Sequence, residues 1–240
     1  MPKPPFIELA DRSRFPILYE DRSVLAIDKP RGWMLVPHSW QKTSRNLQAA
    51  ITSSIAAGDF WARSRGIKFL RHIHRLDADT TGVLLFARSR GALDTIGDLF
   101  ESRQMQKTYL AVAQGEPKER EWICRLPLAP DAKQFGRMRV DVRSGKDAET
   151  GFKLLATHAG LSLIEARPIT GRTHQIRVHL AQAGLPVVGD ELYGRPDGKG
   201  LALRAIALAY VDPFNRHRVS IRAPTESFLA AHGFADVDEA

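Results

Sequence analysis

Residues 72–87 read His72-Ile73-His74-Arg75-Leu76-Asp77-Ala78-Asp79-Thr80-Thr81-Gly82-Val83-Leu84-Leu85-Phe86-Ala87, and the character of the side chains changes halfway. The first part concentrates charged and polar groups. The run 82–87 is apolar and of strand length, which predicts a buried strand. Charges at the entrance of a buried strand cost free energy unless they are paired or used. The residue types alone leave two interpretations open, a solvated loop with an Asp–Thr turn or a functional loop.

Similar short apolar runs recur along the chain between helical patterns. Strands are predicted at 23–28, 82–87, 107–113, 161–169, 205–211 and 217–222, with a hairpin inside 125–151. Helices are predicted at 44–57, 91–103 and 174–183. The short strands outnumber the helices and do not alternate with them regularly. The sequence therefore predicts an α+β fold with a large mixed, mainly antiparallel β-sheet flanked by helices and loops.

The expected organisation is one catalytic domain over residues 16–226. Residues 1–15 are rich in proline and polar side chains, which predicts an N-terminal arm on the surface or partly disordered. Residues 227–240 are expected to form a C-terminal tail. No signal peptide and no bilayer-spanning segment are expected, because no apolar run is long enough.

The composition favours a polyanionic partner. The 240 residues carry 35 Lys and Arg against 27 Asp and Glu, a net charge of +8. Such a surplus attracts nucleic acid through counterion release, although an ordinary basic protein has the same composition. Cys124 is the sole cysteine, which excludes an intrachain disulfide and a cysteine-based metal site and fits a reducing cytoplasm.

A second polar concentration covers residues 171–179. If Thr173 caps a helix there, Ile176 belongs to its buried face and Arg177 lies at the edge of that face, near the helix start. A helix N-terminus is an unfavourable place for a cation. A partner carboxylate would explain Arg177, and a surface arginine is the alternative.

Two other chemistries fit the sequence poorly. A metal site could be assembled from four histidines, but their spacing matches no ligand motif and no cysteine assists. These histidines are His72, His74, His174 and His179. Residues 74–77 share letters with the His-Arg-Asp of protein kinases, but Leu76 breaks the register and no Asp-Phe-Gly is present. We therefore expect no metal and no cofactor.

Four ordered stretches resemble the RluA-type RNA pseudouridine synthases, from about position 17 to 224. They are 18–21 with 24–32, 74–77 with 80–82, 107–111, and 168–180 with 184, 186 and 189–194. Matches in this order over most of the chain make a specific signal, unlike any single short motif. The resemblance implies a single pseudouridine synthase domain with a catalytic cleft across the sheet.

The resemblance also implies catalytic roles. Asp77 matches the aspartate that attacks the target nucleoside, and Tyr109 matches the tyrosine that packs against the uracil and is a candidate for proton transfer at C5. Arg177 matches the basic residue that pairs with that aspartate. The implied reaction is the isomerisation of specific uridines in structured rRNA, tRNA or both, with the base flipped out and without a cofactor.

Substrate binding is implied for four more residues. Arg75 matches the arginine that holds the flipped nucleotide or fills its place in the stack, and Ile176 matches the aliphatic pocket residue. His74 and Thr81 lie in the signature around the aspartate, although the family usually has Ser at position 81. The chain also departs from the family at Arg31, where a small residue is usual.

RNA recognition is expected to rest on the catalytic domain, since too few residues precede it for an extra RNA-binding domain. Basic side chains are candidate phosphate contacts. They are Arg63, Arg65, Lys68, Arg71, Arg137, Arg139 and Arg204. We expect a cytoplasmic monomer with no membrane partner. A catalytically silent RNA-binding protein on the same scaffold is the alternative, and a metal-dependent hydrolase is a third possibility.

Overall fold

The computed structural model of the chain describes residues 2–35 and 45–237. Position 44 of the predicted helix 44–57 and the last three positions of the predicted tail lie outside the described residues. Contacts group the chain into two compact units. One is Met1–Met105 with Ala207–Ala223, and the other is Gln106–Ile206 with Pro224–Ala240. None of the described helices is long and apolar enough to cross a membrane.

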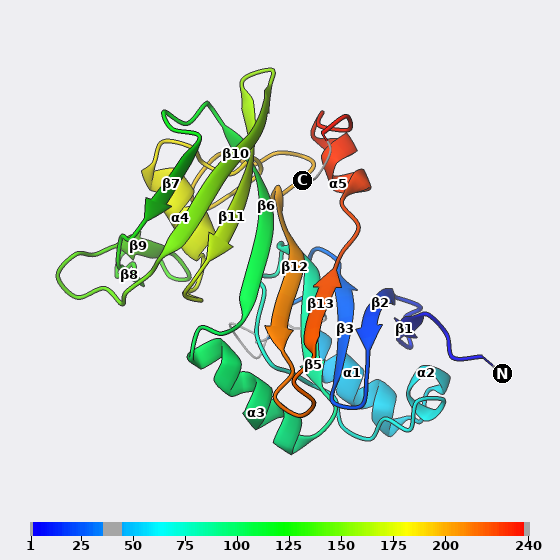
Figure 1. Cartoon of the computed structure of the whole chain (residues 1–240). Coiled ribbons are helices and arrows are strands. Elements are labelled where there is room, and N and C mark those ends of the chain that lie inside the picture. Colours follow the sequence, from blue (N-terminus) through cyan, green and yellow to red (C-terminus); the bar gives the residue numbers. More distant parts are fainter. Residues whose placement is uncertain (1, 36–44, 238–240) are drawn as a thin grey trace. The chain divides into compact units, whose positions relative to one another are not determined.

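The strands form an 11-stranded sheet and a separate two-stranded sheet (Figure 1). Nine pairs of adjacent strands in these sheets are antiparallel, with a defined register of residue partners. Five helices accompany the sheets in the described part of the chain. These observations confirm the predicted α+β fold with a large, mainly antiparallel sheet.

The first unit contains the strand order β1-β2-β3-β5-β12, with β4 paired to β5 and β13 paired to β12. The strands are β1 (Phe6–Glu8), β2 (Arg14–Glu20), β3 (Val24–Lys29), β4 (Arg71–His72), β5 (Thr81–Ala87) and β13 (Arg218–Arg222). β12 (Leu203–Val211) belongs to this unit from Ala207 onward. The helices are α1 (Leu47–Ala56), α2 (Phe60–Arg63) and α3 (Arg90–Glu101).

The second unit contains the strand order β6-β11-β10-β7. These strands are β6 (Gln106–Gln114), β7 (Glu121–Cys124), β10 (Thr150–His158) and β11 (Leu161–Pro168). The smaller sheet is a hairpin of β8 (Leu128–Pro130) and β9 (Met138–Val140). The helices are α4 (Gln175–Gln182) and α5 (Glu226–Ala231).

β3 and β5 explain the continuous apolar runs seen in the sequence. They pair antiparallel with Lys29 opposite Gly82, and their apolar residues on both faces are almost completely buried. A strand covered on both faces has no position left for alternating polar residues. This burial makes the end of β3 and the start of β5 a rigid base for the segment 72–81.

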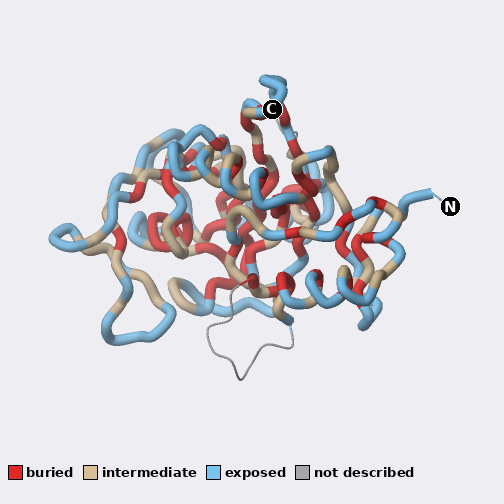
Figure 2. The backbone as a smooth tube through the Cα atoms, turned by 90° about the horizontal axis from the view of Figure 1, so that it is seen from below, coloured by how far each residue is buried: buried red, intermediate tan, exposed pale blue. Residues whose placement is uncertain are grey.

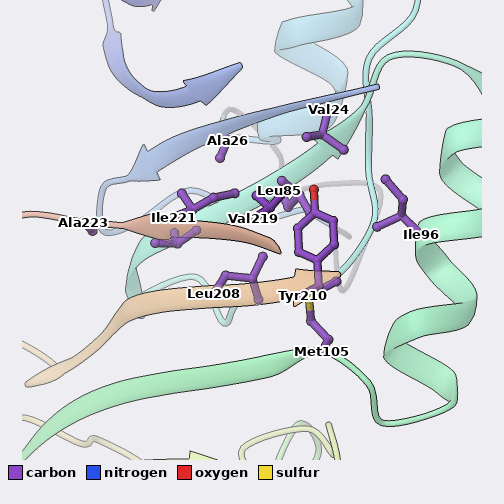
Figure 3. Packing of buried hydrophobic residues seen from close by; sticks show 11 residues of the cluster. Val24, Ala26, Leu85, Ile96, Met105, Leu208, Tyr210, Val219, Ile221 and Ala223 are labelled. Carbon is purple, nitrogen blue, oxygen red and sulfur yellow. The ribbon is translucent and has the colours of Figure 1, made fainter. Parts of the chain in front are cut away.

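One face of these strands packs in a cluster that also includes β12, β13 and α3 (Figure 3). Figure 3 shows the ring of Tyr210 among Leu85, Val219 and Ile96. α3 begins after Ser89, whose hydroxyl accepts a hydrogen bond from the amide of Ala92. This cap satisfies one of the amides that a helix start leaves without an intrahelical partner.

The segment before residue 16 differs from the expected surface arm. Residues 6–8 form β1, which pairs with β2, and Ile7 and Phe15 are fully buried. The burial colours of Figure 2 give the same contrast between the exposed N-terminal end and the buried residues of the strands. The buried apolar side chains hold this segment against the protein, although most of its residues are polar or proline. The domain limits 16–226 stay a prediction. The helix α5 begins at Glu226, the last residue of that range, and extends into the predicted tail.

The start of α4 also differs from the prediction. The N-cap residue is His174, in the left-handed region with φ of 54°, and Thr173 is not the cap. The side chain of Gln175 binds the loop that precedes the helix, since its Oε1 accepts from the amide of Arg172 at 3.0 Å. The helix ends before Gly184, whose φ of 77° favours glycine.

Candidate active site

Asp77 lies on a tight turn that enters β5. Its side chain is half-buried, and its carbonyl accepts a hydrogen bond from the amide of Thr80 at 3.2 Å. Leu76, the preceding residue, is buried. The Asp–Thr turn that residue type suggested is therefore present, and it is attached to the core on both sides.

Lys29 fastens this turn to the end of β3. Its side chain is fully buried, and its ammonium donates hydrogen bonds to the carbonyls of Ala78 at 2.7 Å, Thr80 at 2.9 Å and Pro30 at 3.1 Å. The amide of Gly32 donates to the same Ala78 carbonyl at 2.9 Å. The turn after β3 and the turn after Asp77 therefore hold one another through three hydrogen bonds, while the bond to Pro30 lies within the first turn.

The charge of Lys29 is affected mainly by burial. Burial lowers the pKa of Lys29 to about 8, although the negative charges of Asp79 and Asp77 act in the opposite direction. An ammonium has three donors and all three are used here, so the charged form loses little hydrogen bonding by leaving water. Lys29 is thus a structural anchor for the Asp77 turn.

The histidines of this segment bind backbone and amide groups. Nε2 of His74 accepts from the amide of Leu85 at 3.1 Å, and its ring stacks on Phe100 with the centroids 4.8 Å apart. Nδ1 of His72 lies 2.8 Å from Oε1 of Gln48. Burial, and the charges of nearby arginines, lower the pKa of His72. The described residues contain no group of three metal-ligating side chains close enough to share an ion.

A groove of about 630 Å³ lies in the first unit between α1, α3 and residues 68–71. Its lining combines apolar side chains with three cations, Lys68, Arg71 and Arg90, and one carboxylate, Asp94. Arg65, a neighbour in sequence, is different. Its side chain is 3% exposed, and it donates to Glu20 at 2.6 Å and to the carbonyl of Pro4. The expectation of a phosphate contact is therefore wrong for Arg65, because its guanidinium is buried and bonded inside the protein.

The other predicted catalytic residues lie in the second unit. Tyr109 is half-buried on β6, opposite Ala166 of β11. Ile176 and Arg177 are buried neighbours in the first turn of α4. Arg75, which is exposed, and Thr81, the first residue of β5, belong to the first unit with Asp77 and His74.

Arg177 has the partner carboxylate that its position demanded. Its Nε donates to Oδ2 of Asp190 at 2.7 Å, and its Nη2 donates to Oδ1 at 2.8 Å. The two side chains are 8% and 0% exposed. This two-pronged geometry fixes the plane of the guanidinium and its distance from the carboxylate. The pairing with Asp77 stays a prediction.

Asp190 is the main site residue to which sequence reasoning gave no role. It also accepts hydrogen bonds from the amides of Leu192 at 3.0 Å and Tyr193 at 3.1 Å. Burial alone would raise the pKa of Asp190, but the hydrogen bonds and charge of Arg177 and the two amides outweigh it and lower the pKa. The carboxylate is therefore held in its ionised form. The sequence did contain a sign of Asp190, because residues 189–194 match the last motif of the family, but no role was assigned to the aspartate within that motif.

Tyr193 joins this ion pair to the β8–β9 hairpin. Its hydroxyl accepts from the amide of Met138 at 2.7 Å and lies 2.9 Å from Nδ1 of His174. The guanidinium of Arg177 lies 5.2 Å from the centre of its ring and that of Arg137 lies 5.4 Å from it, both within cation–π range. One aromatic side chain thus links α4, the loop 189–194 and the hairpin.

Gln175 and His179 complete the support of α4. Nε2 of Gln175 donates to Thr150 Oγ1 and to the carbonyl of Glu149, both at 2.9 Å. Oε1 of Gln175 accepts from the hydroxyl of Thr170 at 2.7 Å. His179 lies 3.1 Å from the Thr150 hydroxyl, and burial lowers its pKa. These buried contacts make α4 a rigid support for Arg177.

Comparison with known proteins gives a consistent result. The family model described as RNA pseudouridylate synthase matches residues 23–182. Ribosomal large subunit pseudouridine synthase C of Salmonella typhimurium is 35% identical over 225 residues, which cover 89% of this chain and 67% of that protein. The uncharacterized RNA pseudouridine synthase YhcT of Bacillus subtilis is 36% identical over 214 residues, covering 87% and 68%.

Solved structures agree with the sequence comparison. The human RNA pseudouridylate synthase domain containing 1 structure matches with a TM-score of 0.69 at 25% identity, covering 88% of this chain and 83% of that chain. The structure of human RNA pseudouridylate synthase domain containing 4 matches with a TM-score of 0.71 at 23% identity. The match covers 93% of this chain and 94% of that chain, and it supports the fold alone.

Proposed function

The chain belongs to the RluA-type family of RNA pseudouridine synthases, which are isomerases acting on RNA, and on this premise we propose that it converts specific uridines of structured RNA to pseudouridine. The proposed substrates are ribosomal RNA, transfer RNA or both. The name of the Salmonella relative supports the ribosomal substrate. We expect the enzyme to act as a monomer in the cytoplasm.

Asp77 is the proposed nucleophile. In the reaction the bond between N1 of uracil and C1′ of ribose breaks, the base turns, and a bond between C5 and C1′ forms. The proton leaves C5 and N1 becomes protonated, so no oxidant, reductant or cofactor is consumed. The observation that carries the proposal is the Asp77 turn itself, which Lys29 fastens to the core beside a half-buried carboxylate. A nucleophile fixed in this way needs little reorganisation to react.

Arg177 is the proposed counter-ion of Asp77. Desolvation of a carboxylate favours its neutral acid, and a guanidinium nearby favours the reactive anion. The ion pair with Asp190 supports this role, because it fixes the orientation of the guanidinium. Tyr109 is proposed to stack on the uracil and to take part in proton transfer at C5, and Ile176 to line the pocket.

The target uridine must leave its stack to be reached, so we propose that it is flipped out. Arg75, which is exposed, is proposed to hold the flipped nucleotide or to fill its place. His74 and Thr81 are proposed to support substrate binding from the same segment. The cations of the groove, Lys68 and Arg71 among them, are candidate contacts to the RNA backbone.

Tritium release tests the proposal. Purified protein is incubated with bulk RNA labelled at uracil C5 and taken from a strain that lacks the gene. We expect release by the wild type and by Asp79→Asn, which changes an exposed carboxylate two residues further along the same turn. Asp77→Asn should lose more than about 10³-fold in rate and still bind RNA, since the variant lacks the nucleophile.

Two results would overturn parts of this proposal. Full turnover by Asp77→Asn would remove Asp77 from its role. RNA binding without any tritium release by the wild type would favour the catalytically silent RNA-binding protein, to which the net charge of +8 also fits. Mapping of pseudouridines in the deletion strain would identify the target nucleotide.

A further inference from the structure

Two lysines of this chain share an unusual environment and differ in what surrounds their ammonium groups. Burial lowers the pKa of Lys29 and of Lys107, in each case to about 8. Lys29 donates to three backbone carbonyls, and two aspartates act on its charge. Lys107 donates to one carbonyl, that of Thr170 at 2.9 Å. In the described part of the chain no acidic side chain forms an ion pair with Lys107.

Lys107 is half-buried, and partial burial of an ammonium with one protein partner costs the folded protein free energy. Each ammonium has three donors, so Lys107 keeps two that its described surroundings do not use. Burial without a compensating charge disfavours the cation. Lys29 shows that this fold can satisfy such a group completely. Lys107 can therefore donate further hydrogen bonds to a bound anion.

A second cation belongs to the segment that Lys107 contacts. Arg172 follows two residues after Thr170, and its Nε donates to the backbone carbonyl of Asp147 at 2.9 Å. None of the described carboxylates forms an ion pair with Arg172. The loop between them approaches closely, since a Cβ placed on Gly171 would lie 3.9 Å from the Lys107 ammonium. Two cations thus flank one stretch of backbone.

The position of Lys107 relates it to the proposed pocket. Lys107 and Tyr109 are two residues apart on β6, so their side chains leave the strand on the same face. The chain continues from Thr170 and Arg172 directly into α4, which carries Arg177. An anion bound at Lys107 would accordingly lie beside the base that Tyr109 receives.

We propose that Lys107 and Arg172 form a phosphate site for the RNA backbone next to the target uridine. The inference rests on the proposed function, because it takes the substrate to be RNA and Tyr109 to be its pocket residue. The ligand is a phosphodiester group, held by the ammonium of Lys107 and the guanidinium of Arg172. Its contribution is to hold the strand in register while the base is out of the stack.

Binding at different salt concentrations tests the site. Filter binding of bulk RNA from the deletion strain is measured with Lys107→Met, Lys107→Arg and a control, Lys153→Met, which changes a lysine on β10 that is 50% exposed. All carry Asp77→Asn so that the RNA is not altered. Lys107→Met should weaken binding about 3- to 10-fold and reduce the slope of log K against log salt by about 0.7 to 0.9. Lys107→Arg and Lys153→Met should keep most of the slope.

Lysine footprinting gives a readout that does not depend on catalysis. The protein is treated with an amine-acylating reagent with and without the RNA, and the modified lysines are identified by mass spectrometry. Lys107 should react in the free protein and be protected by RNA, while Lys29 stays unreactive in both and Lys153 reactive in both. Equal modification of Lys107 with and without RNA would overturn the site, as would an unchanged salt slope in a folded Lys107→Met.

The failures of the two proposals are distinguishable. RNA binding with protection of Lys107 but no tritium release would contradict the catalytic function and leave the phosphate site in place. Tritium release by an enzyme whose Lys107 is unprotected would contradict the phosphate site alone. Loss of the salt slope in Lys107→Arg as well as Lys107→Met would also overturn it, because charge would then not be what matters.

Discussion

The turn after Asp77 and the loop around Asp190 belong to different units of the chain and are held in different ways. The first is fixed by one lysine side chain that binds three backbone carbonyls. The second is fixed by an ion pair, two backbone amides and a tyrosine that reaches the β8–β9 hairpin. The Asp77 turn therefore depends on one residue, and the Asp190 loop on several interactions that support each other.

The two regions also differ in what they position: Lys29 positions a stretch of backbone, and Asp190 positions a side chain. Lys29 determines where the backbone of residues 78–80 lies, and it leaves the Asp77 side chain to its own surroundings. Asp190 acts directly on the guanidinium of Arg177 and fixes its plane. A change at Lys29 should thus move a whole turn, whereas a change at Asp190 should first affect one side chain and its charge.

The largest effect on stability is expected for Asp190→Asn. The variant leaves the buried Arg177 without its carboxylate, which should cost about 4 kcal/mol of unfolding free energy. Urea denaturation measures this cost, and Glu191→Gln, which changes the exposed neighbour, is the matched control. A cost below about 1 kcal/mol would mean that the Asp190–Arg177 pair does not hold the loop.

Lys29→Met should have the next largest effect, about 3 kcal/mol, because three carbonyls lose their donor while no charge is left unpaired. Its activity should fall further than its stability suggests, since the Asp77 turn loses its anchor. Urea denaturation and tritium release measure the two quantities, with Lys118→Met in an exposed loop as the control. If Lys29→Met stayed fully active, the anchoring of Asp77 would have to come from elsewhere.

The smallest effects are expected in the pH dependence of stability, where the two regions should respond in different windows. The pKa of Asp190 is lowered from its ordinary value of 3.8, so the advantage of the wild type over Asp190→Asn should be present above that value and disappear as the pH falls below it. The pKa of Lys29 is lowered from 10.5 to about 8. The unfolded chain then binds more protons between these values, so stability relative to Lys29→Met should rise with pH across this window.

Urea denaturation of the three proteins from pH 3 to pH 10 measures both windows. Parallel curves for the wild type and Asp190→Asn below pH 5 would show that the pKa of Asp190 is not lowered in the folded protein. Parallel curves for the wild type and Lys29→Met above pH 8 would show that Lys29 titrates at its ordinary value.

Much of the fold was predictable from local patterns. The strands at 23–28, 82–87, 107–113 and 161–169 correspond to β3, β5, β6 and β11 within a few residues. Helices 44–57 and 91–103 correspond to α1 and α3. These elements are buried on one face or both, so the spacing of their apolar residues along the sequence reflects which faces are buried. The strands β1, β2, β4, β7 and β10 were missed, since mixed polar and apolar residues give no clear period there.

The sequence offered a partner carboxylate for Arg177 and left a surface arginine as the alternative, and it did not identify Asp190 as the partner. A cation at a helix start is unfavourable wherever the helix lies, so its sequence position alone signals a partner. Asp190 comes 13 residues later in a turn, and only the folded chain brings it within 2.7 Å of Arg177. Thr173 shows the reverse case. It has a capping side chain, yet the N-cap residue is His174, in the left-handed region of backbone conformation.

The sequence by itself determined the fold class, the family and the candidate residues Asp77, Tyr109 and Arg177, because these follow from local periodicity and from the order of motifs along the chain. The tertiary structure alone decided which groups hold them. The carbonyls of Ala78 and Thr80 bound by Lys29, the carboxylate bound by Arg177 and the Thr170 carbonyl bound by Lys107 are contacts between residues separated in sequence. Hydrogen bonds and ion pairs act over a few ångströms in space, and residue order does not specify which distant groups come that close.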